Sequence, residues 1–147
     1  MTPEIHPATA ARWNDVVAVI GNCAVANRCW CAYWYLSNAD FKAGWGEGNR
    51  LPLEARVLGG EEPGIIAYVE GEPAAWVSVA PRTDFDRLNR SRNFAPIDDA
   101  PVWAVNCFVV ARRFRRQSPG GEPGLWGASE GALKRGGVTG RRPAQAR

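Results

Sequence analysis

The sequence has few of the residues from which metal and redox sites are built. It contains one histidine, His6, and four cysteines, Cys23, Cys29, Cys31 and Cys107. A structural zinc site usually needs two closely spaced ligand pairs, and this chain offers a single Cys-x-Cys pair. A disulfide across that pair would close a small, strained ring. We therefore expect no metal and no disulfide at Cys29 and Cys31, and interpret them as small buried side chains in an aromatic cluster.

A long hydrophobic run is also missing. No segment approaches the roughly 18 apolar residues of a membrane-spanning helix. Residues 1–12 show no basic stretch followed by an apolar one, as a secretory signal would require. These absences predict no membrane partner and favour the cytoplasm as the compartment. The length of 147 residues fits one domain with its own hydrophobic core.

The positive charge lies at one end of the chain. The net charge is +3, but residues 112–147 hold nine arginines and lysines against two glutamates, so the preceding part is mildly acidic. The basic end has little aromatic surface on which bases could stack, with Trp126 the one aromatic residue after Gln117. We therefore predict that nucleic acid is not a partner.

Helical spacing of apolar residues predicts two helices in the first half. The first should be capped by Thr9 or Asn14 and end at Gly21. The second should be a short helix capped by Asn49 and closed by the glycines at 59–60.

Runs of β-forming residues predict a hairpin and one further strand. The hairpin strands are residues 65–69 and 74–80, joined around Gly71. Residues 102–110 are apolar on both faces, which is typical of a central strand covered on both sides.

The composition changes after Gln117. Residues 118–147 hold eight of the sixteen glycines and three of the eleven prolines, with no helical or strand periodicity. This composition predicts a disordered tail, and a domain that occupies residues 1–117. Two origins of the tail stay open: a frame-shifted or truncated gene, and a divergent tail.

Four motifs carry a resemblance to a known family. They are "RCWCAYW" at 28–34, "NADFKA" at 38–43, "GEPAAWVSVAPRTDFDRLNRSR" at 71–92 and "VWAVNCFVVARRFRR" at 102–116. In this order and spacing they resemble the GCN5-related N-acetyltransferase (GNAT) superfamily, and within it an actinobacterial-type subgroup with a CWC motif. The resemblance covers residues 5–117. It implies an α/β (α+β) fold, a mixed and mostly antiparallel sheet flanked by helices, incomplete at the C-terminus.

The resemblance also implies a site for acetyl-CoA. Family members hold the pantetheine arm against the backbone of a central strand and the pyrophosphate in the turn that follows it. The matching positions in this chain are Phe108, Val110, Arg115, Arg116, Gln117 and Gly120. The chain departs from the pattern at Ser118 and at Pro119, which has no N–H for a phosphate. No residue matches a general acid or base, so the catalytic residues stay unknown.

Acetyl transfer from acetyl-CoA to a small-molecule or peptide amine, without a metal, is thus the implied function. Loss of the C-terminal half of the fold would impair it, so we expect weak, salt-dependent binding of acetyl-CoA. The alternative is a non-catalytic protein that associates through an exposed sheet edge at 102–110, for instance as a homodimer.

Overall fold

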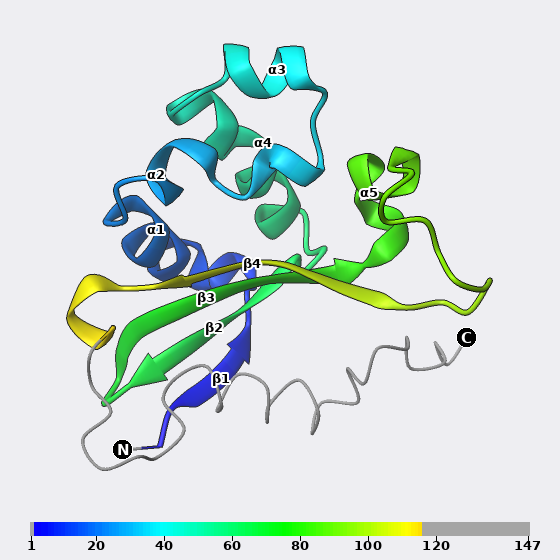
Figure 1. The fold of residues 1–147 in the computed structure, drawn as a ribbon. Coiled ribbons are helices and arrows are strands. Elements are labelled where there is room, and N and C mark those ends of the chain that lie inside the picture. Colours follow the sequence, from blue (N-terminus) through cyan, green and yellow to red (C-terminus); the bar gives the residue numbers. More distant parts are fainter. Residues whose placement is uncertain (1, 116–147) are drawn as a thin grey trace.

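The chain folds around a single antiparallel sheet. A computed structural model describes residues 2–115 and shows four strands in the order β1-β2-β3-β4, each antiparallel to its neighbour (Figure 1). The strands are β1 (Glu4–Pro7), β2 (Gly64–Val69), β3 (Glu72–Pro81) and β4 (Trp103–Val110). The predicted mixed α/β fold with an antiparallel sheet and flanking helices is confirmed.

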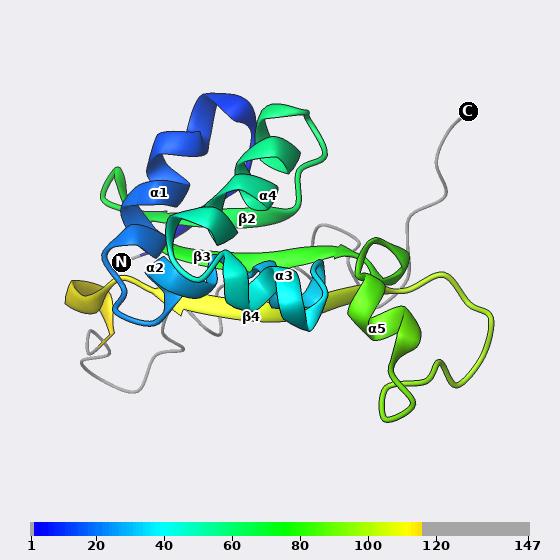
Figure 2. The same cartoon turned by 90° about the horizontal axis from the view of Figure 1, so that it is seen from above.

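Most of the helices cover one face of this sheet. Figures 1 and 2 show α1, α2, α3 and α4 on that face, and α5 in the connection between β3 and β4. Their bounds are α1 (Trp13–Gly21), α2 (Ala26–Cys29), α3 (Asn38–Ala43), α4 (Glu47–Leu58) and α5 (Asp86–Arg90). The described residues also form four short 3-10 turns: η1 (Ala10–Arg12), η2 (Ala32–Trp34), η3 (Arg82–Asp84) and η4 (Arg112–Phe114).

The main core lies between these helices and the sheet. Ile20 of α1 and Leu53 of α4 are fully buried against Ile66 of β2 and Trp76 of β3. Burying a large apolar side chain contributes about 1.5–3 kcal/mol relative to leaving it in water. The amphipathic spacing of α1 and α4 is therefore what fixes them on the sheet.

The predicted hairpin is confirmed. β2 and β3 pair directly, and Glu70 and Gly71 between them both have positive φ values, 52° and 78°. Two successive residues with positive φ are the geometry of the two-residue turn whose twist suits a hairpin. A glycine at the second position adopts it without strain.

The predicted covering of the last strand is wrong for the described part of the chain. Within residues 2–115, β4 pairs with β3 on one side, and helices cover one face of the sheet. Val109 is the buried residue of β4, whereas Val105 is 48% exposed. In the described part of the chain, the second face of β4 is therefore not covered by a helix.

The predicted cap of the second helix is also wrong. α4 already begins at Glu47, and Asn49 lies inside its first turn, fully buried. The Asn49 Nδ2 group donates to the carbonyl oxygens of Arg28 at 3.2 Å and Phe41 at 3.1 Å. Asn49 thus ties α2 and α3 to α4, and tertiary contacts rather than local capping explain its place.

The start of the first helix also differs from the prediction. α1 begins at Trp13, with Asn14 inside it, and Thr9 precedes the 3-10 turn η1 without capping it through its side chain. The predicted end at Gly21 is confirmed.

Two further expectations concern the whole chain. In the part that the structure describes, no helix is long and apolar enough to cross a membrane. The predicted tail at 118–147 lies outside the described residues.

Candidate functional site

The CWC motif is a packed corner between two helical turns. α2 ends at Cys29, and the next two residues take the left-handed conformation, with φ of 49° at Trp30 and 55° at Cys31. This bend turns both side chains into the main core, where Trp30 is 2% and Cys31 3% exposed. The Nε1–H of Trp76 donates to Cys31 Sγ at 3.3 Å. Cys31 is thus the small buried side chain that the sequence predicts, whereas Cys29 is half-buried.

A second thiol faces Cys31 from the sheet. Cys107 of β4 packs against the main core, and its thiol interacts with that of Cys31. Acting as a hydrogen-bond donor, the Cys31 thiol favours the thiolate of Cys107 and lowers the pKa of Cys107. The same interaction, together with burial, raises the pKa of Cys31 well above its usual value. All four cysteines are free thiols, and residues 2–115 contain no cluster of three potential metal ligands.

The edge of β4 that faces away from β3 carries backbone groups of two predicted site residues, Phe108 and Val110. The Ala111 N–H donates to the Ala74 carbonyl oxygen at 2.8 Å, so in this antiparallel register the backbone of Ala111 faces β3. Because hydrogen-bonding directions alternate along a strand, the N–H and C=O groups of Val110 and Phe108 point away from β3.

A bulge interrupts β4 near its middle. Ser78 pairs with Cys107 and the next residue, Val79, pairs with Val105, so Asn106 has no partner on β3. A bulge of this kind re-aims the backbone and increases the local twist. The Asn106 Nδ2 group is buried and makes no hydrogen bond within the described residues. The bulge therefore places an unpaired residue beside the outward-facing groups of β4.

Basic residues follow directly after β4, in and beside η4. Arg115 folds back, donating from Nε to the Val110 carbonyl oxygen at 2.8 Å and from Nη2 to Cys23 Sγ at 2.9 Å. Arg113 forms an ion pair with Glu72. Of the predicted cofactor-binding residues, Phe108, Val110 and Arg115 thus lie together at one end of β4. The others, Arg116, Gln117 and Gly120, lie outside the described residues.

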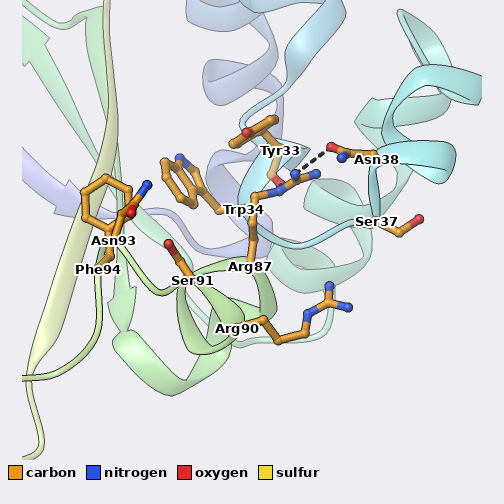
Figure 3. Close-up of a pocket in the computed structure, with 9 residues that line it drawn as sticks. All are labelled: Tyr33, Trp34, Ser37, Asn38, Arg87, Arg90, Ser91, Asn93 and Phe94. Carbon is orange, nitrogen blue, oxygen red and sulfur yellow. Dashed lines mark hydrogen bonds between the residues drawn. The ribbon is translucent and has the colours of Figure 1, made fainter.

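A pocket lies at the opposite end of β4. Its volume is about 480 Å³, and we call it the Arg87 pocket (Figure 3). The segment 33–38 contributes Tyr33, Trp34, Ser37 and Asn38 to its lining. The segment that contains and follows α5 contributes Arg87, Arg90, Ser91, Asn93 and Phe94.

Arg87 joins the two segments that line this pocket. Its guanidinium donates to the Tyr33 carbonyl oxygen at 2.5 Å, to Asn38 Oδ1 at 2.7 Å and to the Leu36 carbonyl oxygen at 2.9 Å. The same group lies 3.8 Å from the centre of the Tyr33 ring. Because these contacts occupy its guanidinium on several sides, Arg87 holds the walls of the pocket in place.

The pocket and the beginning of β4 adjoin the same buried cluster. Trp34 packs against the buried cluster around Phe85, and Ala104 of β4 packs against that same cluster. Ala104 precedes Cys107 by three positions, or about 10 Å along a strand. The sequence did not indicate this pocket. One feature of the sequence could have indicated it: Arg87 and Arg90 are three residues apart and so lie on one face of a helix. By composition alone, this charged stretch looks like solvated surface.

Comparison with known proteins gives a match at the level of the fold. No protein-family model matches the chain, and no curated protein matches it. A solved structure described as "histone acetyltransferase HPA2 and related acetyltransferase" from Corynebacterium glutamicum is similar, with a TM-score of 0.51 and 19% identity. The match covers 91% of this chain and 72% of that one. The chain therefore has a fold in common with a GNAT-type acetyltransferase.

Proposed function

We propose that this chain is an N-acetyltransferase that moves an acetyl group from acetyl-CoA to an amine. One observation carries the proposal. On a fold that matches an acetyltransferase, the outward-facing backbone groups of Phe108 and Val110 end next to the basic residues after β4. An outward-facing strand edge followed by positive charge suits a ligand with amide groups at one end and phosphates at the other.

The residues of the chain have distinct roles in this proposal. Backbone groups of Phe108 and Val110 pair with the amides of the pantetheine arm, as an added strand would. The Val110 carbonyl oxygen accepts from Arg115 Nε in the structure, so that hydrogen bond must first be released. The bulge at Asn106 re-aims the strand, and backbone N–H groups beside it would hydrogen-bond the thioester carbonyl and stabilise charge that develops there. Acetyl-CoA itself supplies the activated acyl group. The general acid and base stay unassigned.

Phosphate binding would depend on Arg115 and on the predicted contacts of Arg116, Gln117 and Gly120. To reach a phosphate, Arg115 must give up its hydrogen bonds to Val110 and Cys23. This exchange of contacts costs part of the energy gained, so we expect weak binding of CoA. Because much of the attraction comes from exposed arginines, the binding should weaken as salt screens them.

A small molecule or the end of a peptide would supply the amine. The Arg87 pocket, about 480 Å³ in volume, suits a ligand of this size, and its Trp34 packs against the same buried cluster as Ala104 of β4. Four free thiols support the cytoplasm as the compartment, since cytosolic cysteines are kept reduced.

The proposal is tested by titration calorimetry with CoA at low and high salt, and by release of the CoA thiol from acetyl-CoA with a panel of amines. We expect weak binding that falls with salt, and slow turnover. The variant Val110→Pro removes an outward N–H without removing a hydrogen bond to β3, and should weaken CoA binding roughly 2- to 10-fold.

The matched control is Val105→Pro, at another outward-facing position in the first half of β4. It should leave CoA affinity near that of the parent chain, with unfolding of both variants followed by circular dichroism. Absence of both CoA binding and turnover would refute the proposed function. Tight, salt-insensitive binding would leave the function standing and refute the expectation of weak binding.

A second candidate function is association through β4. Within the described residues β4 has one strand neighbour, and Val105 is 48% exposed on it. A strand edge with apolar side chains is a template for pairing with another chain, here a second copy.

A further inference from the structure

The lining of the Arg87 pocket is unbalanced in charge. It contains two arginines and no aspartate or glutamate among its nine residues. Figure 3 shows the rings of Trp34 and Phe94 at one end, and Asn38 and Arg90 towards the other. The two rings meet edge to face with centres 6.0 Å apart, and Phe94 is 54% exposed. The pocket therefore offers positive charge and apolar surface side by side.

The two arginines differ in how many of their N–H groups remain available to a ligand. Arg87 donates to three oxygen atoms of the protein. Arg90 is exposed, and within residues 2–115 its side chain makes one hydrogen bond, from Nε to the Asp86 carbonyl oxygen at 3.4 Å, near the upper limit for such a bond. Its terminal N–H groups thus retain a planar fork that can bind a carboxylate or a phosphate with two hydrogen bonds.

This charge distribution selects against a simple cationic acceptor. An ammonium group near two guanidinium groups is repelled unless a negative charge accompanies it. The same repulsion lowers the pKa of a bound amine and so favours the neutral form, which is the form that attacks a thioester. An acceptor with its own anionic group gains attraction from Arg90 and still presents a neutral amine.

We propose that the Arg87 pocket binds an acceptor amine that carries a carboxylate or phosphate beside an aromatic or apolar body, with Arg90 as the anion-binding residue. The proposal rests on the proposed function, because the pocket is assigned to the acceptor. Trp34 and Phe94 contact the apolar body, Arg90 holds the anion, and the amine lies towards the beginning of β4.

The binding test uses the full chain without acetyl-CoA. Phenylacetate and phenyl phosphate probe the two anions, and phenethylamine is the cation of similar shape. We expect one or both anions to bind, and phenethylamine to bind more weakly. Arg90→Gln should weaken anion binding about tenfold, and Arg90→Lys less, because lysine keeps the charge and loses the fork. Arg92→Gln, an exposed arginine outside the lining, is the matched control and should change nothing.

A transfer assay separates failure of the pocket from failure of the function. Phenylalanine should be acetylated faster than phenethylamine, and Arg90→Gln should remove the difference. Anion binding that depends on Arg90, with no acetylation of any amine, would overturn the proposed function and leave the anion site. Faster acetylation of phenethylamine, or anion binding unchanged in Arg90→Gln, would overturn the pocket proposal and leave the function.

Discussion

At the scale of single residues, a charge-assisted hydrogen bond joins the sheet to α1. The Tyr68 hydroxyl donates to Asp15 Oδ2 at 2.6 Å. Burial, followed by this bond to a carboxylate, raises the pKa of Tyr68 from 10 to about 12. A tyrosine whose pKa is higher in the folded chain stabilises it below the unfolded pKa of about 10. That contribution is lost as the pH rises towards 12.

Tyr68→Phe should therefore destabilise the chain by about 1 kcal/mol near neutral pH, since the pair is only partly buried. The difference from the parent chain should shrink between about pH 10 and 12. Urea unfolding at several pH values measures it. Asp15→Asn keeps an acceptor and loses the charge, so it should cost less. A difference that grows with pH would contradict this account.

A second prediction concerns the thiol pair of Cys31 and Cys107. The Cys31 thiol lowers the pKa of Cys107, so removing the donor should raise that pKa and slow alkylation of Cys107 near pH 8. Cys31→Ala removes the donor, whereas Cys31→Ser replaces it with a hydroxyl. We expect the midpoint of the alkylation rate against pH to move upward in Cys31→Ala and to move less in Cys31→Ser. Peptide mass spectrometry identifies the labelled residue, and identical midpoints would disprove the role of Cys31.

At the scale of the elements, β2 and β3 leave no room for a side chain at Gly64. A Cβ atom there would lie 2.7 Å from Cζ3 of the Trp76 ring and closer still to the backbone oxygen of Val77. Neither the backbone nor this fully buried ring can move aside without cost. Gly64→Ala should therefore destabilise the chain by about 1–3 kcal/mol or more.

The control substitution should change the free energy of unfolding in the opposite direction. Gly48 lies in α4, and a Cβ atom there would meet nothing within 4 Å. Gly48→Ala should stabilise the chain by about 0.5 kcal/mol, because alanine loses less conformational entropy in a helix. Chemical unfolding of both variants decides the point, and a neutral Gly64→Ala would show that the sheet is looser than described.

The elements also show what the sequence predicts and what it does not. The hairpin and β4 were predicted because each is a run of β-forming residues with clear turn residues. β1, α2 and α3 have four, four and six residues, too few for any periodicity to appear. The Arg87 pocket unites segments about 50 residues apart through Arg87, and no local pattern shows such a contact. The cofactor positions came from resemblance rather than from periodicity.

At the scale of the whole molecule, the outer edge of β4 determines whether the second candidate function, pairing of two copies into a dimer, is available. Val105→Lys places a charge on that edge, which discourages pairing between strands. If copies pair through β4, sedimentation velocity should show the parent chain as a dimer and Val105→Lys as a monomer. Glu62→Lys, an exposed change away from β4, should leave the dimer intact. A parent chain that stays monomeric at high concentration would exclude the second candidate function.

The order of the strands has a consequence for how the molecule is made. β1 pairs with β2 through partners such as Glu4 and Tyr68, whereas β2 and β3 are joined by two residues. During synthesis at about 5–20 residues per second, β1 waits roughly 3–12 s before its partner strand has been made. The hairpin of β2 and β3 can then close within microseconds. β1 has only four residues, Glu4 and His6 among them, and so short and polar a strand is a poor template for pairing with a wrong chain during that wait.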